Sequence, residues 1–151
     1  MKKKIFLAAI LLLSAVGFAS AQCINGTKSY PIYKAGAQLV SEYDNQGKEI
    51  VHIQYDLLFD SRETFRDLTT DWEYSIIAFA DDGVKDIDLK IYAWDDLLEV
   101  WNLVAQDNSE EGIAMITYQP EETGRHKIEV IAFEFNEGYT AARYGLFIVH
   151  D

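Results

Sequence analysis

The chain has little cysteine, proline or positive charge. Among its 151 residues there are one cysteine and two prolines, and 13 lysines and arginines stand against 25 acidic residues. Because Cys23 is alone, an internal disulfide is excluded, and stability must come from a packed core. The net charge of −12 repels phosphate, which argues against nucleic acid as a partner.

Long apolar runs are also lacking, apart from one at the start of the chain. Three lysines, Lys2 to Lys4, precede an apolar run from Ile5 to Phe18, and Ala19-Ser20-Ala21 follows it. This order is typical of a secretory signal peptide, so we predict one over residues 1–21. The run is too short to span a membrane, and none of that length follows. We therefore expect an exported mature chain, secreted or periplasmic, without a transmembrane segment.

Cys23 is the second residue of that predicted mature chain. A cysteine in this place can carry a lipid anchor when a small residue precedes it, but here Gln22 does. We therefore favour a free thiol or an intermolecular disulfide at Cys23 over lipidation.

Catalytic motifs are missing as well. His52, His126 and His150 lie far apart in the sequence, and neither H-E-x-x-H nor G-x-S-x-G occurs. Paired acids such as Glu110-Glu111 lie in polar segments, where solubility explains them. We predict that the protein is not an enzyme, and a small hydrolase is the least favoured function.

Residues 22–48 show no clean periodicity. Gly26, Pro31, Gly36 and Gly47 interrupt them, and such residues usually mark turns and loops. We therefore expect an irregular N-terminal arm here.

From Glu49 onward apolar and polar residues alternate. In Glu49–Asp60, Val51, Ile53 and Tyr55 fall on one face, which is the period of a half-buried strand. Comparable short runs, separated by turn residues, continue to the end of the chain. Such a series predicts an all-β fold, a jelly-roll-like antiparallel β-sandwich of about eight strands. Residues 49–151 are expected to form this single domain.

The segment Asp95–Gln106 supports two interpretations. Leu97, Leu98 and Trp101 have helical spacing, and Asp95 is a good residue to cap a helix. Alternatively, a loop leads into a strand from Trp101 to Ala105.

Five sequence words stand in a set order between Glu73 and Val130. They are Glu73-Tyr74-Ser75-Ile76, Asp86-Ile87-Asp88-Leu89-Lys90-Ile91-Tyr92, Asn102-Leu103-Val104-Ala105-Gln106-Asp107, Ile116-Thr117-Tyr118-Gln119-Pro120 and Thr123-Gly124-Arg125-His126-Lys127-Ile128-Glu129-Val130. In this order they resemble the bacterial pre-peptidase C-terminal domain, a β-sandwich module of secreted proteins. Such domains usually accompany an enzyme, and some bind matrix protein, polysaccharide or calcium. The resemblance favours a loop and a strand for Asp95–Gln106. This chain replaces the family's short D-x-x-G turn with Ala93 to Trp101, so no ligand site is carried over.

An acidic cluster flanks one predicted turn. Its members are Asp81, Asp82, Asp86 and Asp88, with Asp107 near the far end. Calcium prefers such oxygen ligands, which makes these residues weak candidates for a metal site. However, a D-x-D-x-D-G loop is absent, and alternation places Asp86 and Asp88 on a solvent face. We favour turn formation and solvation, expect no cofactor, and keep calcium as the alternative.

Aromatic residues around the Ala93–Trp101 insertion are the candidate ligand contacts. Tyr92, Trp94 and Trp101 are side chains that commonly bind sugar rings or protein partners. We predict a secreted or periplasmic, non-catalytic binding module that recognises a polysaccharide or an envelope or extracellular protein through loops at one end of the sandwich. The alternative is a structural or accessory envelope protein that pairs with another chain through its sheet edges or Cys23.

Overall fold

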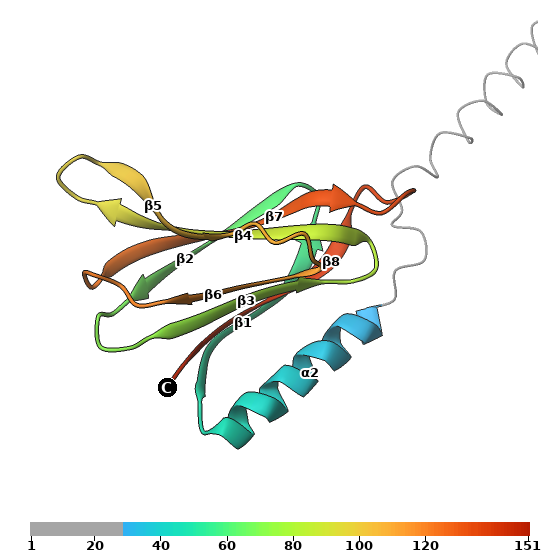
Figure 1. Ribbon diagram of the computed structural model, residues 1–151, viewed down its shortest axis with the longest axis horizontal. Helices are drawn as coiled ribbons and strands as arrows, with labels where there is room; N and C mark the ends of the chain where they lie inside the picture. The colour runs from blue at the N-terminus through green and yellow to red at the C-terminus, as the bar shows by residue number, and fades with distance from the viewer. Residues whose placement is uncertain (1–28) are drawn as a thin grey trace, which may run out of the picture.

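Two antiparallel sheets of four strands face each other in the computed structural model, which describes residues 29–151 (Figure 1). The first sheet has the order β1-β8-β3-β6, formed by Glu49–Leu58, Ala142–His150, Tyr74–Ala80 and Ile113–Tyr118. The second has the order β2-β7-β4-β5, formed by Ser61–Leu68, Gly124–Phe135, Val84–Asp95 and Val100–Asp107. The predicted all-β antiparallel sandwich is confirmed.

Between the sheets lies a core of alternating apolar side chains. Each strand turns every second residue inward, so Ile87, Leu89 and Ile91 of β4 are fully buried. They meet Ile128 and Val130 of β7, and the facing core residues Ile76, Ala78, Leu146 and Ile148 come from β3 and β8. The alternation of apolar and polar residues therefore places the apolar side chains between the two sheets, as the sequence predicts.

Most connections carry the chain from one sheet to the other. Within the described residues, only β4 and β5 are consecutive strands paired in one sheet. The predicted loop and strand for Asp95–Gln106 are confirmed, because β4 ends at Asp95 and β5 begins at Val100. The β4–β5 hairpin extends beyond the other strands at one end of the sandwich (Figure 1).

A helix, α2 (Ser29–Gln46), replaces most of the predicted irregular arm. Ile32, Leu39 and Tyr43 lie on one face of α2 and pack on the outer face of the first sheet against Phe79 and Phe147. The prediction was wrong because proline and glycine were interpreted as breakers. Pro31, Gly36 and Gly47, three of the four residues interpreted in this way, are compatible with the helix.

Each of these three residues has a place that a helix tolerates. Pro31 lies in the first turn, where its missing N–H is not needed. Gly47 follows the last helical residue with φ of 72°, a left-handed conformation that favours glycine at a helix end. Gly36 is buried at the contact with the sheet, and the space beside it is filled by Tyr55.

The remaining N-terminal predictions are not reached by the structure. The signal peptide over residues 1–21, the rest of the irregular arm over residues 22–28, and the thiol of Cys23 lie outside the described residues. In the described part, no helix combines the length and hydrophobicity that a membrane crossing requires.

Candidate functional site

The outer face of the second sheet carries a group of aromatic rings around one lysine. We call Phe65, Tyr92, Trp94, Trp101 and Lys127 the aromatic surface. Strand register assembles it: Lys127 of β7 lies between Phe65 of β2 and Tyr92 of β4, and Trp94 pairs with Trp101. The three candidate ligand residues predicted from sequence are thus brought together.

The Trp101 side chain extends across this face. Its ring centroid lies 5.6 Å from that of Phe65 and 5.1 Å from that of Trp94. Two strands separate β5 from β2 in the sheet, a backbone distance of about 14 Å at ordinary strand spacing. The rings of Trp101 and Phe65 can meet only because their side chains reach over β4 and β7. A continuous row of rings therefore runs from Phe65 to Trp94.

The side chain of Lys127 lies at the centre of the aromatic surface. Its Nζ lies 4.3 Å from the ring centroid of Tyr92 and 5.8 Å from that of Trp101, and it pairs with Glu63 Oε1 at 2.8 Å. The Tyr92 hydroxyl donates to Glu129 Oε2 at 3.0 Å. Burial and this carboxylate both raise the pKa of Tyr92. The rings are therefore bordered by charged groups that hydrogen-bond.

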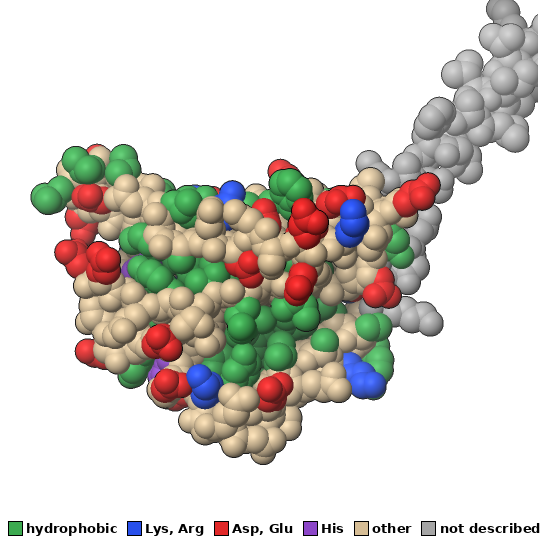
Figure 2. Space-filling model, in the orientation of Figure 1, with side chains coloured by type: hydrophobic (Ala, Val, Ile, Leu, Met, Phe, Trp, Pro, Cys, Tyr) green, Lys and Arg blue, Asp and Glu red, His purple; other side chains and the backbone are tan. Residues whose placement is uncertain are grey.

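Next to this surface, the tip of the β4–β5 hairpin exposes two leucines. Leu97 is 95% exposed and Leu98 is 69% exposed. Asp95 Oδ1 accepts hydrogen bonds from the backbone N–H groups of both leucines, and Glu99 has a left-handed φ of 54°. Figure 2 shows hydrophobic side chains protruding at this end of the molecule. The backbone is thus held in a conformation that presents both leucines to solvent.

Two of the five acidic candidates hold turns together. Asp81 accepts backbone hydrogen bonds from Gly83 and Arg143. Asp107 accepts them from Ser109 and Met115 at 2.9 and 2.8 Å. Burial raises the pKa of Asp107, but these hydrogen bonds outweigh burial and the pKa is lowered. Both carboxylates are therefore occupied by the protein itself, as the turn interpretation expects.

Asp86 and Asp88 do not lie on a solvent face, contrary to the prediction. Each is only 7% exposed, because the segment after β5 covers this part of β4 and Glu111 O accepts from Ile87 N. Burial raises the pKa of both carboxyls, and Glu110 raises that of Asp86 further. Asp86 Oδ1 is enclosed without a hydrogen-bond partner in the described part of the chain. Alternation places a side chain on a face, but it does not show what covers that face.

The acidic candidates do not converge on one point. Among residues 29–151, no three His, Cys, Asp or Glu side chains lie together in a way that could hold a metal ion. Asp82 contributes its backbone carbonyl, which accepts from Asn136 Nδ2 at 2.8 Å. Calcium binding stays a prediction.

The three histidines occupy separate places. His52 contacts Arg66 and Gln54, and both burial and the Arg66 charge lower its pKa. His126 is buried, with its ring nitrogens near Tyr118 Oη and Gly124 O at 3.1 and 2.9 Å, and burial lowers its pKa. His150 stacks on Trp72 with ring centroids 3.9 Å apart. Each ring has a structural partner.

Sequence reasoning missed Phe65 and Lys127. Both residues fall within the series of short strands that the sequence predicts from Glu49 onward. Their position beside Tyr92 depends on the strand order β2-β7-β4, which joins segments about sixty residues apart. Neither the spacing of apolar residues nor the turn residues in the sequence indicate the order of the strands in the sheet. An exposed phenylalanine in a strand was the one available signal.

Comparison with solved structures finds similar structures at low sequence identity. CorA, a surface-associated copper-binding protein of Methylomicrobium album BG8, is 9% identical over 66% of this chain and 93% of CorA, with a TM-score of 0.53. The pre-peptidase C-terminal domain of a Bacillus anthracis collagenase is 10% identical over 64% of this chain and 87% of that domain, with a TM-score of 0.48. A CBM4 structure is 16% identical over 69% of this chain and 77% of that one, with a TM-score of 0.41.

No protein-family model and no curated protein sequence matches the chain. The pre-peptidase C-terminal domain indicated by the sequence words is among the similar solved structures, and the likeness to CorA is one of fold. Fold alone does not name a ligand, so function has to be argued from the aromatic surface.

Proposed function

We propose that the protein is an exported, non-catalytic binding module that holds a polysaccharide against the aromatic surface. The observation that carries this proposal is the row of rings from Phe65 through Trp101 to Trp94 on an open sheet face. The rings lie on strands β2, β4 and β5 rather than on end loops, so the binding face differs from the one predicted. Strands position side chains more rigidly than loops do.

The chemistry of this surface suits a sugar chain. Aromatic faces pack against the apolar C–H faces of pyranose rings, and polar groups beside them bind the hydroxyls. Glu63, Lys127 and Glu129 supply such groups, since Lys127 pairs with Glu63 and Tyr92 donates to Glu129. Several neighbouring rings favour an extended ligand, because each sugar unit contributes a modest contact.

A glycan array followed by calorimetry tests the proposal. We expect the processed chain to bind at least one polysaccharide, and Trp101→Ala and Phe65→Ala each to weaken binding about tenfold, equivalent to ~1.4 kcal/mol. Phe133→Ala is the matched control, because Phe133 is 70% exposed on β7 but lies outside the aromatic surface. Equal affinity of the Trp101 and Phe133 variants, or no glycan bound by the parent, would contradict the proposal.

The leucine tip supports a second candidate function, the binding of a protein partner. Leu97 and Leu98 are held outward at the end of a projecting hairpin, beside the acidic residues Asp96 and Glu99. Such a tip fits an apolar pocket with a basic rim on an envelope or extracellular protein.

One double variant separates the two functions. Leu97→Ser with Leu98→Ser should leave glycan affinity unchanged, since the aromatic surface keeps its rings. A photo-crosslinker placed at position 98 should yield one defined adduct in an envelope extract. Absence of an adduct, or a loss of glycan binding in the double serine variant, would contradict a protein-binding role for the tip.

A further inference from the structure

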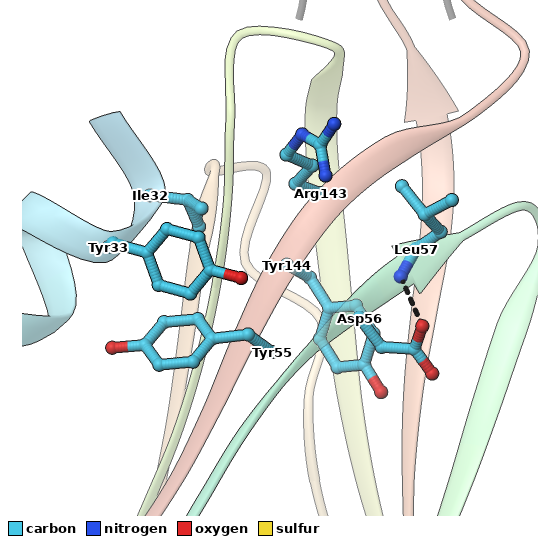
Figure 3. A pocket seen from close by; sticks show the side chains of 7 residues that line it. All are labelled: Ile32, Tyr33, Tyr55, Asp56, Leu57, Arg143 and Tyr144. Carbon is cyan, nitrogen blue, oxygen red and sulfur yellow. Dashed lines mark hydrogen bonds between the residues drawn. The ribbon is translucent and has the colours of Figure 1, made fainter. Parts of the chain in front are cut away.

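A small pocket lies on the other side of the molecule from the aromatic surface, between the start of α2 and strands β1 and β8. Its volume is ≈ 180 Å³, and it is lined by Ile32, Tyr33, Tyr55, Asp56, Leu57, Arg143 and Tyr144 (Figure 3). Liquid water occupies about 30 Å³ per molecule, so this space corresponds to roughly six waters. That is room for one ring-sized unit.

The Arg143 side chain lines this pocket and has no side-chain hydrogen bond or ion pair within residues 29–151. Its Nε is enclosed and has no hydrogen-bond partner among residues 29–151, and within that range no carboxylate forms an ion pair with its guanidinium. An enclosed guanidinium N–H that stays unpaired is destabilising. The planar guanidinium donates in a fork that matches a carboxylate. Arg143 is therefore positioned to receive an anion from outside the described chain.

The charges around the pocket differ from those of the chain as a whole. The protein carries a net charge of −12, yet Arg143 and Arg62 both lie close to Leu57 here, against two carboxylates, those of Asp56 and of Asp81, which accepts from Arg143 N. Helix α2 begins beside the pocket and has no acidic residue in its first turn. A helix N-terminus carries partial positive charge, which adds to the attraction for an anion.

A tyrosine completes the lining on the helix side of the sheet. Asp56 pairs with Tyr144 in the strand register, so its side chain lies on the inter-sheet side and not beside Arg143. The Tyr33 hydroxyl points across the pocket toward β8, while that of Tyr55 points the other way (Figure 3). Tyr33 is half exposed and its ring packs edge-on against Tyr55, with centroids 4.7 Å apart, so part of the Tyr33 ring stays open to a ligand.

We propose that this pocket binds one carboxylate-bearing sugar unit, a uronic acid, with Arg143 on the carboxylate and Tyr33 on the sugar ring and a hydroxyl. A simple anion would use Arg143 but leave the open part of the Tyr33 ring uncovered. A neutral sugar would leave the guanidinium unpaired. A sugar acid uses both side chains at once, because it combines a carboxylate with a ring and hydroxyls.

Calorimetry on the processed chain tests this with galacturonate, glucuronate, galactose, glucose and acetate. We expect one of the two uronates to bind at least tenfold more tightly than its neutral counterpart and than acetate. Arg143→Gln should weaken uronate binding at least tenfold, and Tyr33→Phe should weaken it severalfold. Lys34→Gln removes the same charge from an exposed position of α2 outside the pocket lining, and it should bind like the parent.

Other results would overturn the site. Equal affinity for uronate and neutral sugar excludes recognition of the carboxylate, and equal affinity for uronate and acetate excludes recognition of the ring. No uronate binding by the parent, or unchanged binding by Arg143→Gln, also contradicts the proposal. Melting curves for each variant check folding. If Arg143→Gln is unstable, the uronate affinity of Tyr33→Phe tests the same pocket independently. Trp101→Ala should keep full uronate affinity, so this proposal and the polysaccharide proposal fail separately.

Discussion

The hydroxyl of Tyr55 fills the space that a Cβ would need at Gly36. A methyl group added there would overlap this hydroxyl and approach the ring carbon that bears it. Tyr55 has little freedom to move away, because Tyr33 and Phe147 pack against its ring with centroids 4.7 and 6.0 Å away. Glycine at position 36 therefore sets how closely α2 approaches the first sheet.

Gly36→Ala should destabilise the protein although alanine is the better helix former. Alanine gains about 1 kcal/mol of helix propensity, and the overlap with Tyr55 is expected to exceed this by about 1–2 kcal/mol. Urea unfolding measures the difference. Adding Tyr55→Phe should recover part of the loss, while Gln38→Ala on the exposed face of α2 should change stability by less than about 0.5 kcal/mol. A Gly36→Ala variant more stable than the parent would show that α2 does not dock here.

Buried Asp86 should destabilise the fold at neutral pH. Burial and the nearby Glu110 and Glu134 raise its pKa, so the folded state binds the proton more tightly than the unfolded state does. A carboxyl with a raised pKa contributes stability below its unfolded value, and that contribution is lost as pH rises through the folded pKa. Asp86→Asn should therefore raise the unfolding free energy at pH 7 by about 1 kcal/mol and have little effect below about pH 3.5.

The same variant examines the calcium prediction. Asp82→Asn is the stability control for Asp86→Asn, because Asp82 is exposed and lies outside the buried pair. If calcium raises the melting temperature of the parent but not of Asp86→Asn, the acidic cluster binds metal. If melting is unchanged by calcium in both, the candidate metal site is excluded. An Asp86→Asn variant less stable than the parent at pH 7 would contradict the electrostatic account.

Tyr144 should make the fold sensitive to alkali. Burial, with a contribution from the Asp56 charge, raises the pKa of Tyr144 to about 12, and its hydroxyl accepts from Gln54 Nε2 at 2.8 Å. An unfolded tyrosine ionises near pH 10, so the stabilising effect is complete below about pH 10 and lost between about 10 and 12. The loss should reach about 2–3 kcal/mol across that window.

Urea unfolding at a series of pH values up to about 11.5 measures this loss. Other tyrosines contribute to the slope in the same range, so Tyr144→Phe is compared with the parent. The phenylalanine variant should start less stable, because Gln54 loses its acceptor, and should then show the shallower decline with pH. Parallel declines would show that Tyr144 ionises as freely as an exposed phenol.

The sheet architecture was predictable, because each core strand repeats its burial every two residues. Ile87, Leu89 and Ile91 show this period plainly, and all three are buried. Helix α2 was missed because Gly36 and Pro31 are breakers in most contexts. In this helix Gly36 is needed for packing against Tyr55, a contact with a strand that follows it in the sequence. Local pattern carries no information about such a contact.

The candidate site was predictable in part. Tyr92, Trp94 and Trp101 are conspicuous in the sequence because exposed aromatics are uncommon, and register joins them on one hairpin. Phe65 and Lys127 could not be added, since their strands join this sheet through long-range pairing. Arg143 was unremarkable in a strand until the packing of α2 enclosed it.

The central claim, that the aromatic surface binds a polysaccharide, is tested most directly by the three indole N–H signals in a ¹H–¹⁵N spectrum. The protein has three tryptophans, and Trp72 stacks on His150 while Trp94 and Trp101 contact each other. On titration with a glycan selected by the array, the signals of Trp94 and Trp101 should move together to saturation while that of Trp72 stays in place. Movement of Trp72 alone, or no movement of any indole signal at a glycan concentration that saturates binding, would contradict the account.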